Sequence, residues 1–385
     1  ITTGLLYLLG IGTVMGALAA LLYLLPPRPR RAVEMGLLAI PVVSLLDSSL
    51  FAGRGLSVTA ALVTFVMGML LAYVWQPARD RITRTVGAMP TQRQRAVSTA
   101  AYILLGLVVL ALPLLGPYPA EILDTVGLYI LMGLGLNIVV GFAGLLDLGY
   151  VAFFALGAYT VGVLTSPEIQ WLGIHLTWWQ ALPFAVLVGT LAGIILGVPV
   201  LQMRGDYLAI VTLGFGEIIR LVFLSDWLKP YVGGSNGITR IPRALKASET
   251  LKLSDQQMLF YVILAGILLA AFIANRLKHS RLGRNWAAMR EDEDVAQAMG
   301  INLVRTKLLA FATGAGLSAL SGAIFASKLT SIYPHSFNLL VSINILAVII
   351  VGGLGSIPGV IVGALVLVGL PELLREFAEY RLLVY

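Results

Sequence analysis

The chain is dominated by apolar runs that are long enough to cross a lipid bilayer as helices. Crossing the hydrocarbon core takes about 20 consecutive apolar residues. By this criterion the sequence predicts spans near 4–25, 57–75, 97–115, 120–141, 147–165, 183–203, 207–224, 258–275 and 308–329. Two further apolar stretches, 35–51 and 340–374, are interrupted by proline, aspartate or glycine. We therefore expect an all-α, polytopic helical membrane protein of roughly ten to twelve transmembrane segments, some of them broken by glycine.

The composition excludes several other classes of protein. Of the 385 residues, 58% are hydrophobic and 12% are charged, whereas a soluble domain carries about 25% charged residues. The chain has no cysteine, and its three histidines lie far apart, so a metal site or thiol chemistry is not expected. Nucleotide-binding and hydrolase motifs are also missing from the sequence. We expect no enzyme activity, no cofactor bound by this chain and no nucleic-acid partner.

Basic residues are concentrated in three polar islands, at 28–31, 79–95 and 276–307. Loops rich in lysine and arginine usually stay in the cytoplasm, so we place these islands there. Loops 166–181 and 225–257 then fall on the outer face, although the second is itself basic. The widest polar gaps are about 30 residues, which is too short for an independently folding domain. Any soluble part of the machinery is therefore expected on other chains.

Glycine-rich segments interrupt the apolar runs at 141–150 and 352–359. Non-helical backbone at membrane depth is tolerated only where protein or a water-filled cavity satisfies its polar groups. Both interruptions end a helix in glycines, which fits either two related halves of a transporter or a chance similarity. Their backbone groups would offer donors and acceptors to a zwitterionic solute. The candidate pathway residues in and beside them are Asn137, Gly144, Asp147, Tyr150, Gly353 and Gly355.

Asp147, Glu217 and Arg220 are charged residues inside or beside the apolar runs. Asp147 is either a functional intramembrane carboxylate or the N-cap of the next helix. Glu217 and Arg220 are spaced i, i+3 within one apolar helix, where they can pair on one face. This pair either lines the translocation pathway or only neutralises itself.

The island at 276–307 contains a short segment that is typical of a helix with an apolar stripe. Acidic residues crowd its start at 291–294, where they complement the helix dipole, and Gly300 is placed to end it. Val295 and Met299 fall on the apolar stripe. The segment is either a solvated loop helix or a helix that docks on another protein. The candidate docking residues are Arg290, Glu291, Asp292, Asp294, Ala296 and Gly300.

Long motifs recur along the second part of the chain. They are LGLNIVVG at 134–141, GLLDLGY at 144–150, ALGAY at 155–159, RGDYLAIVTLGFGEI at 204–218, GGSNGI at 233–238, LGR at 282–284 and REDE at 290–293. In this order they resemble the LivM-type permease of branched-chain amino-acid ABC importers, and the resemblance covers about 97–385. Residues 1–96 are expected to form an N-terminal transmembrane extension. Members of the family continue into another span, so we expect this final family helix to be absent.

The resemblance implies a multi-pass permease subunit of the bacterial inner membrane that forms half of a translocation pathway. Its partners would be a second permease of LivH type, two cytoplasmic ATPases that bind ATP and magnesium, and an extracytoplasmic amino-acid-binding protein. Within loop 275–307, the helix at 291–300 would be the coupling helix that docks on an ATPase. The implied substrates are leucine, isoleucine and valine, with another amino acid, an amide or urea as the alternative. An ion-coupled secondary transporter and a non-transporting scaffold are further alternatives.

Overall fold

The computed structural model describes residues 106–107, 109–169, 173, 175–200, 203, 205–245 and 254–373. The chain divides into two compact units, Ile1–Val108 and Val109–Tyr385, and nearly all of the described residues belong to the second. The predicted spans near 4–25, 35–51 and 57–75 lie outside the described residues, as does the extension 1–96. The fold given below is that of the second unit.

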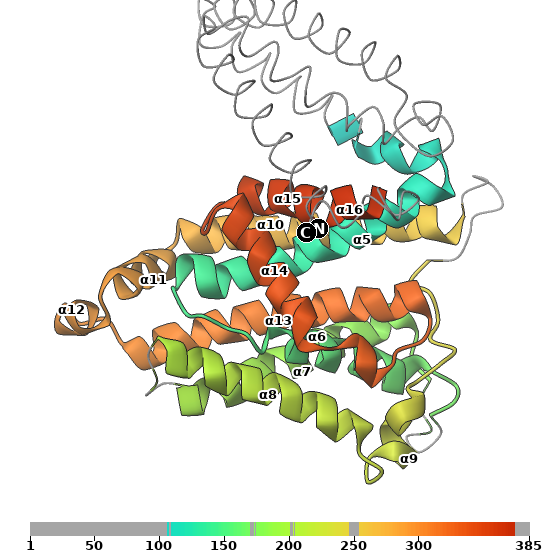
Figure 1. Ribbon diagram of the computed structural model, residues 1–385, viewed down its shortest axis with the longest axis horizontal. Coiled ribbons are helices and arrows are strands. Elements are labelled where there is room, and N and C mark those ends of the chain that lie inside the picture. The colour runs from blue at the N-terminus through green and yellow to red at the C-terminus, as the bar shows by residue number, and fades with distance from the viewer. Residues whose placement is uncertain are drawn as a thin grey trace, which may run out of the picture. The chain divides into compact units, whose positions relative to one another are not determined.

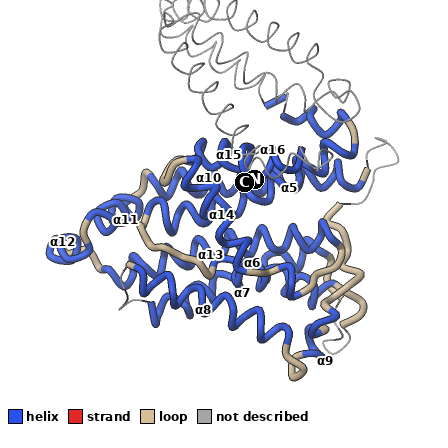
Figure 2. Tube along the Cα trace, in the orientation of Figure 1, coloured by secondary structure: helices blue, strands red, loops and turns tan. Residues whose placement is uncertain are grey.

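The described part of the chain is built from helices joined by loops (Figures 1 and 2). In chain order these are η2 (Leu112–Leu115), α5 (Pro117–Leu136), the π-helix η3 (Asn137–Phe142), α6 (Tyr150–Thr165), α7 (Trp178–Val200), α8 (Asp206–Leu224), α9 (Lys229–Val232), η4 (Gly234–Asn236), α10 (Asp255–Lys278), α11 (Arg281–Glu291), α12 (Glu293–Ala298), α13 (Leu303–Leu329), η5 (Pro334–Ser336), α14 (Leu339–Gly352), α15 (Ile357–Ala364), the π-helix η6 (Leu365–Gly369) and α16 (Leu370–Leu373). Among these residues, β-type pairing is limited to one isolated bridge between Ile238 and Ile332.

Six of the described helical segments are long and apolar enough to cross a membrane. They are Tyr118–Phe142, Trp178–Pro199, Tyr207–Leu224, Asp255–Lys278, Leu303–Leu329 and Pro334–Gly352. Two shorter apolar segments, Tyr150–Thr165 and Ile357–Gly369, accompany them. The helical, polytopic fold is thus confirmed. The predicted stretch 340–374 is divided into α14 and α15 by a non-helical turn at 353–356.

Helix α13 lies at the centre of this unit and packs against α5, α6 and α7. Its contact with α6 is close because each helix presents a glycine to the other. A Cβ atom at Gly157 would collide with the carbonyl oxygen of Ala319, and one at Gly322 would collide with that of Phe154. Small residues allow such close packing of helix backbones in lipid, where dispersion replaces the hydrophobic drive.

The helices run between two ends, which we name after the short helices found there (Figure 1). The α9 end carries α9, η4 and the loops near 166–169, 238–245 and 330–333, and the backbone bridge between Ile238 and Ile332 lies here. The α11 end carries α11, α12 and the segments that interrupt α5–α6 and α14–α15. The described parts of the predicted outer loops lie at the α9 end and those of island 276–307 at the α11 end, while the side of the membrane that each end faces stays a prediction.

Candidate functional site

The first interruption follows a change in helix geometry. Helix α5 continues as the π-helix η3 through Phe142, and residues 143–149 are non-helical before α6 begins at Tyr150. Gly144 adopts a φ of +74°, a conformation that favours glycine. Single turns of π-helix are rare and often occur at functional sites. The interruption is therefore shorter than the predicted 141–150, because Gly141 still belongs to a helical turn.

The π-helix η3, which directly precedes the first interruption, meets the second interruption in space, although the two are more than 200 residues apart in the sequence. The Oδ1 atom of Asn137 accepts a hydrogen bond of 2.8 Å from the backbone nitrogen of Gly355. Gly141 lies directly beside them, so close that a Cβ atom there would be 2.6 Å from the nitrogen of Gly355. Asn137 is fully buried. The structure thus brings Asn137 and Gly355, two of the candidate pathway residues, into one cluster.

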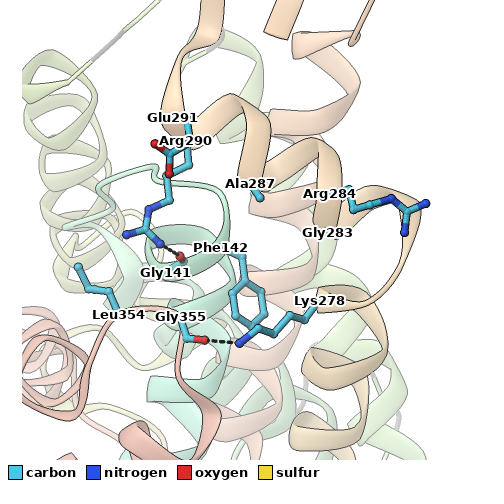
Figure 3. A pocket seen from close by; sticks show the side chains of 10 residues that line it. All are labelled: Gly141, Phe142, Lys278, Gly283, Arg284, Ala287, Arg290, Glu291, Leu354 and Gly355. Atoms are coloured by element: carbon cyan, nitrogen blue, oxygen red, sulfur yellow. Dashed lines mark hydrogen bonds between the residues drawn. The ribbon is translucent and has the colours of Figure 1, made fainter.

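Two cationic side chains hold the carbonyl groups of this cluster (Figure 3). Arg290 of α11 donates from Nη1 to the oxygen of Gly141 at 2.6 Å. Lys278, the last residue of α10, donates from Nζ to the oxygen of Gly355 at 2.8 Å and lies 5.5 Å from the ring centroid of Phe142. We call Asn137, Gly141, Lys278, Arg290 and Gly355 the glycine node.

The node borders a cavity of about 340 Å³. Its remaining lining residues are Phe142, Gly283, Arg284, Ala287, Glu291 and Leu354. Figure 3 shows Arg284 extending away from the Gly141 carbonyl, on the opposite side of the cavity from Arg290. The cavity is therefore lined by three cations and one carboxylate, and two of the cations are bound to backbone oxygens.

Asp147 lies inside the first interruption and is 1% exposed. Its Oδ1 atom accepts a hydrogen bond of 2.9 Å from the nitrogen of Gly149, which is itself the N-cap residue of α6. The interpretation of Asp147 as the N-cap is therefore wrong, and its carboxylate instead shapes the turn before the helix. The next residue, Leu148, donates from its nitrogen to Oγ1 of Thr212 at 3.0 Å, which ties the turn to α8.

Tyr150 is fully buried between α6 and α13. Its hydroxyl donates to the carbonyl oxygen of Gly314 at 3.1 Å, and Oγ of Ser318 donates to the carbonyl of Tyr150 at 3.2 Å. Within this chain the side chain of Tyr150 joins two helices and does not reach the surface.

Glu217 and Arg220 pair within α8, in agreement with their spacing. Nε of Arg220 lies 3.1 and 3.0 Å from the two carboxylate oxygens. The side chains are 22% exposed for Arg220 and 44% for Glu217. The pair therefore lies at the surface of this chain, on a helix whose other exposed side chains are mostly apolar. These are Tyr207, Ile210, Ile218, Leu221 and Val222.

The docking segment consists of two helices and not one. Helix α11 ends at Glu291 and α12 begins at Glu293, because Asp292 adopts an extended conformation between them. Asp292 caps α12 by accepting hydrogen bonds from the nitrogens of Asp294 and Val295 at 2.9 and 3.0 Å. The predicted single helix over 291–300 is thus corrected: Glu291 belongs to the last turn of α11. The predicted stop is present, since Gly300 follows α12 with a φ of +86°.

Two apolar side chains are exposed on α12 and directly after it, and the inner side of the helix is anchored. Val295 is 59% exposed and Met299 79%, whereas Ala296 is buried. On the inner side, Glu293 forms an ion pair of 2.9 Å with Lys307, which is 2% exposed. Asp292, Asp294 and Gly300 are exposed beside the apolar surface. We call Val295 and Met299 the α12 patch.

Comparison with known proteins identifies the family. Residues 118–385 match the family described as "Branched-chain amino acid transport system / permease component". The chain belongs to this family of permeases. It is 41% identical over 277 residues to the high-affinity branched-chain amino acid transport system permease protein LivM of Salmonella typhimurium, and equally to LivM of Escherichia coli K12. The match covers 66% of this chain and 63% of each LivM protein.

More distant relatives extend the likeness. The chain is 24% identical over 265 residues to the permease protein LivH of Salmonella typhimurium, which covers 64% of this chain and 82% of LivH. No solved structure shows a significant match to the chain. The resemblance to LivM-type permeases that the sequence motifs suggested is confirmed.

Sequence reasoning missed part of the site. Lys278 and Gly141 were not among the candidate residues, and their roles depend on contacts with residues far away in the chain. Arg290 was grouped with the docking residues, whereas its guanidinium binds Gly141 inside the chain. The basic character of island 276–307 was a usable signal for Lys278, but it did not indicate which carbonyl the ammonium would bind.

Proposed function

We propose that this chain is a permease subunit of an ATP-driven importer of leucine, isoleucine and valine, located in the bacterial inner membrane. The family match over residues 118–385 carries this proposal. The 41% identity to LivM supports the LivM role, and the six apolar helices support a multi-pass location. The chain spans 63% of the length of these LivM relatives, so activity, substrate and partners are proposals that need testing.

The α12 patch supports docking to a cytoplasmic ATPase, which would carry the ATP and magnesium. Val295 on α12 and Met299, the residue that caps the C-terminal end of this helix, are both more than half exposed. Burial of each side chain by a partner would contribute about 1.5–3 kcal/mol. Capping by Asp292 and the anchor between Glu293 and Lys307 hold this surface in place without a partner. A preorganised helix of this kind loses little entropy when it docks.

The Glu217–Arg220 pair supports contact of α8 with a second permease of LivH type and with the pathway. Charged groups in a membrane span usually face a protein interior or a water-filled cavity, because exposure to lipid is costly. In this chain the pair is partly exposed on α8. A second permease would cover this face, and the polar space between the two subunits would then conduct the solute.

The experiment is reconstitution into proteoliposomes of this chain with a LivH-type permease, two ATPases and the amino-acid-binding protein. We expect uptake of radiolabelled leucine that requires ATP and is lost with a hydrolysis-deficient ATPase. Uptake of urea or an amide in place of leucine would contradict the proposed substrate, but not the proposed importer function. Gradient-driven uptake by the chain without ATPases would favour a secondary transporter, and the absence of any uptake would favour a scaffold.

A further inference from the structure

Helices α11 and α12 are bonded to the start of α13. Trp286 of α11 is fully buried and donates from Nε1 to the carbonyl of Thr306 at 2.9 Å. Lys307 pairs with Glu293 of α12 at 2.9 Å. Asp292 joins α11 to α12 as the cap. We call α11, α12 and the first turns of α13 the loop block.

The loop block is bonded through Arg290 to the end of η3, directly before the first membrane interruption. Gly141 lies in the last turn of η3, where carbonyl groups have no following helical N–H to accept from. The guanidinium of Arg290 supplies that donor at 2.6 Å. A hydrogen bond from a charged donor is shorter and stronger than a neutral one, which suits a contact that has to survive movement.

The sequence leaves space for this contact at Gly144. A Cβ atom at Gly144 would lie 2.8 Å from Cγ of Arg290, and the φ of +74° also favours glycine there. Gly144, one of the candidate pathway residues, thus lets the Arg290 side chain pass to Gly141.

The second interruption is bonded to the same elements. Lys278 ends α10 three residues before α11 begins, and it donates to the carbonyl of Gly355. Asn137 then closes the cluster by accepting from the nitrogen of Gly355. One displacement of α11 would therefore pull on Gly141 directly and on Gly355 through both Asn137 and Lys278.

We infer that Arg290 is a positioning residue that transmits the position of the loop block to both membrane interruptions, and that it acts inside the chain and not as a contact to the ATPase. This inference rests on the proposed function, since the ATPase is what would move the block. It separates Arg290 from the α12 patch, which makes the contact with the ATPase.

The first experiment compares Arg290→Gln with Arg281→Gln in the assembled transporter. Arg281 is a matched control because it lies on the same helix and is exposed, yet it does not line the cavity. We expect Arg290→Gln to copurify with the ATPases and hydrolyse ATP normally, while leucine uptake per ATP falls about tenfold. Arg281→Gln should behave as the unchanged chain. Wild-type uptake per ATP, or loss of the ATPases from Arg290→Gln, would overturn the inference.

The second experiment measures the node itself, so that a transport defect is not confused with misfolding. The chain has no cysteine, so Leu354→Cys introduces a single labelling site. Leu354 lies next to Gly355 and is 43% exposed. In the permease alone, Arg290→Gln should raise its maleimide labelling rate several-fold, and Arg290→Lys should raise it less. In the complex, ATP should change the rate only when Arg290 is present. Equal rates with and without Arg290 would overturn the inference.

Failure of the unchanged chain to copurify with ATPases would instead count against the proposed function. The labelling of the permease alone keeps the two outcomes distinct, because it needs no ATPase.

Discussion

At the α9 end, two loops are joined backbone to backbone, whereas at the α11 end two helix interruptions are joined mainly by side chains. Ile238 and Ile332 exchange hydrogen bonds of 3.0 and 2.9 Å, and the nitrogen of Ile241 donates to Thr330 at 2.9 Å. At the other end, Arg290 and Lys278 reach glycine carbonyls through long side chains. Backbone pairs have essentially one geometry, while long side chains can follow a moving partner.

This difference indicates which end can change shape during transport. Glycines with positive φ occur at both ends, at 144, 353 and 355 and at 233, 234 and 237, so the difference lies in how the segments are joined. The α9 end buries Ile238, Ile241 and Ile332 beneath its backbone bridge. We therefore expect the α9 end to stay fixed while the α11 end moves.

The largest effect is expected from breaking the anchor of the loop block. Glu293→Gln leaves the charge of Lys307 buried without its partner, and removal of one member of a buried pair costs about 3–5 kcal/mol. We expect Tm of the purified permease to fall by several degrees, measured by intrinsic fluorescence. Glu291→Gln, which changes an exposed carboxylate two residues away, should leave Tm unchanged, and an equal Tm for both variants would show that the anchor contributes nothing.

A smaller but still clear effect is expected at the α12 patch. Met299→Lys places a charge where an apolar side chain would be buried by the ATPase, at a cost of about 1.5–3 kcal/mol. Copurification of the ATPase should fall about tenfold or more, since each 1.4 kcal/mol is a factor of ten in affinity. Gln297→Lys adds the same charge to the same helix and serves as control. Unchanged recovery of the ATPase with Met299→Lys would mean that the patch faces something else.

Helix α8 joins the two ends and gives the next test. Arg220→Ala leaves Glu217 without its partner, whereas the double change Glu217→Gln with Arg220→Met removes both charges. Because an uncompensated charge in a span is costly, the single variant should show lower expression and uptake than the double variant. Both are measured in membranes by quantitative blotting and leucine uptake. If the two variants behave equally, the pair does not interact in the membrane.

The smallest effect is expected at the α9 end. Hydrogen bonding from Thr239, with help from Arg240, holds the pKa of Glu168 below its usual value. A depressed pKa means that the ionised form favours the folded state, so this contribution is present at neutral pH and is lost as the pH falls below the normal range of glutamate. Glu168→Gln should lower Tm only slightly at pH 7, and the difference should shrink as the pH falls below the normal range of glutamate. A difference that does not shrink on acidification would contradict this origin.

Local patterns in the sequence predicted most of the helices. Runs of about 20 apolar residues located α5, α7, α8, α10 and α13, and the i, i+3 spacing located the Glu217–Arg220 pair. The motif order identified the family. These features depend on neighbours within a few turns, which a sequence displays directly.

The glycine node could not be predicted because its contacts are long-range. Asn137 and Gly355 are 218 residues apart, and Arg290 and Gly141 are 149 apart. The docking segment divides at Asp292 because that residue caps the following helix. A run of four acidic residues does not show which of them will be the cap. The glycines at 141–144 and 352–355 indicated that the helices break, but not that the breaks meet.

The most direct test of the account is hydrogen–deuterium exchange on the assembled transporter, with and without ATP, using a hydrolysis-deficient ATPase. Both ends are then compared in one experiment on one sample. We predict that ATP changes exchange several-fold in residues 143–149 and 353–356, while residues 238–241 and 330–332 keep the same rates. Equal changes at both ends, or changes confined to the α9 end, would contradict the claim that the α11 end is the moving part.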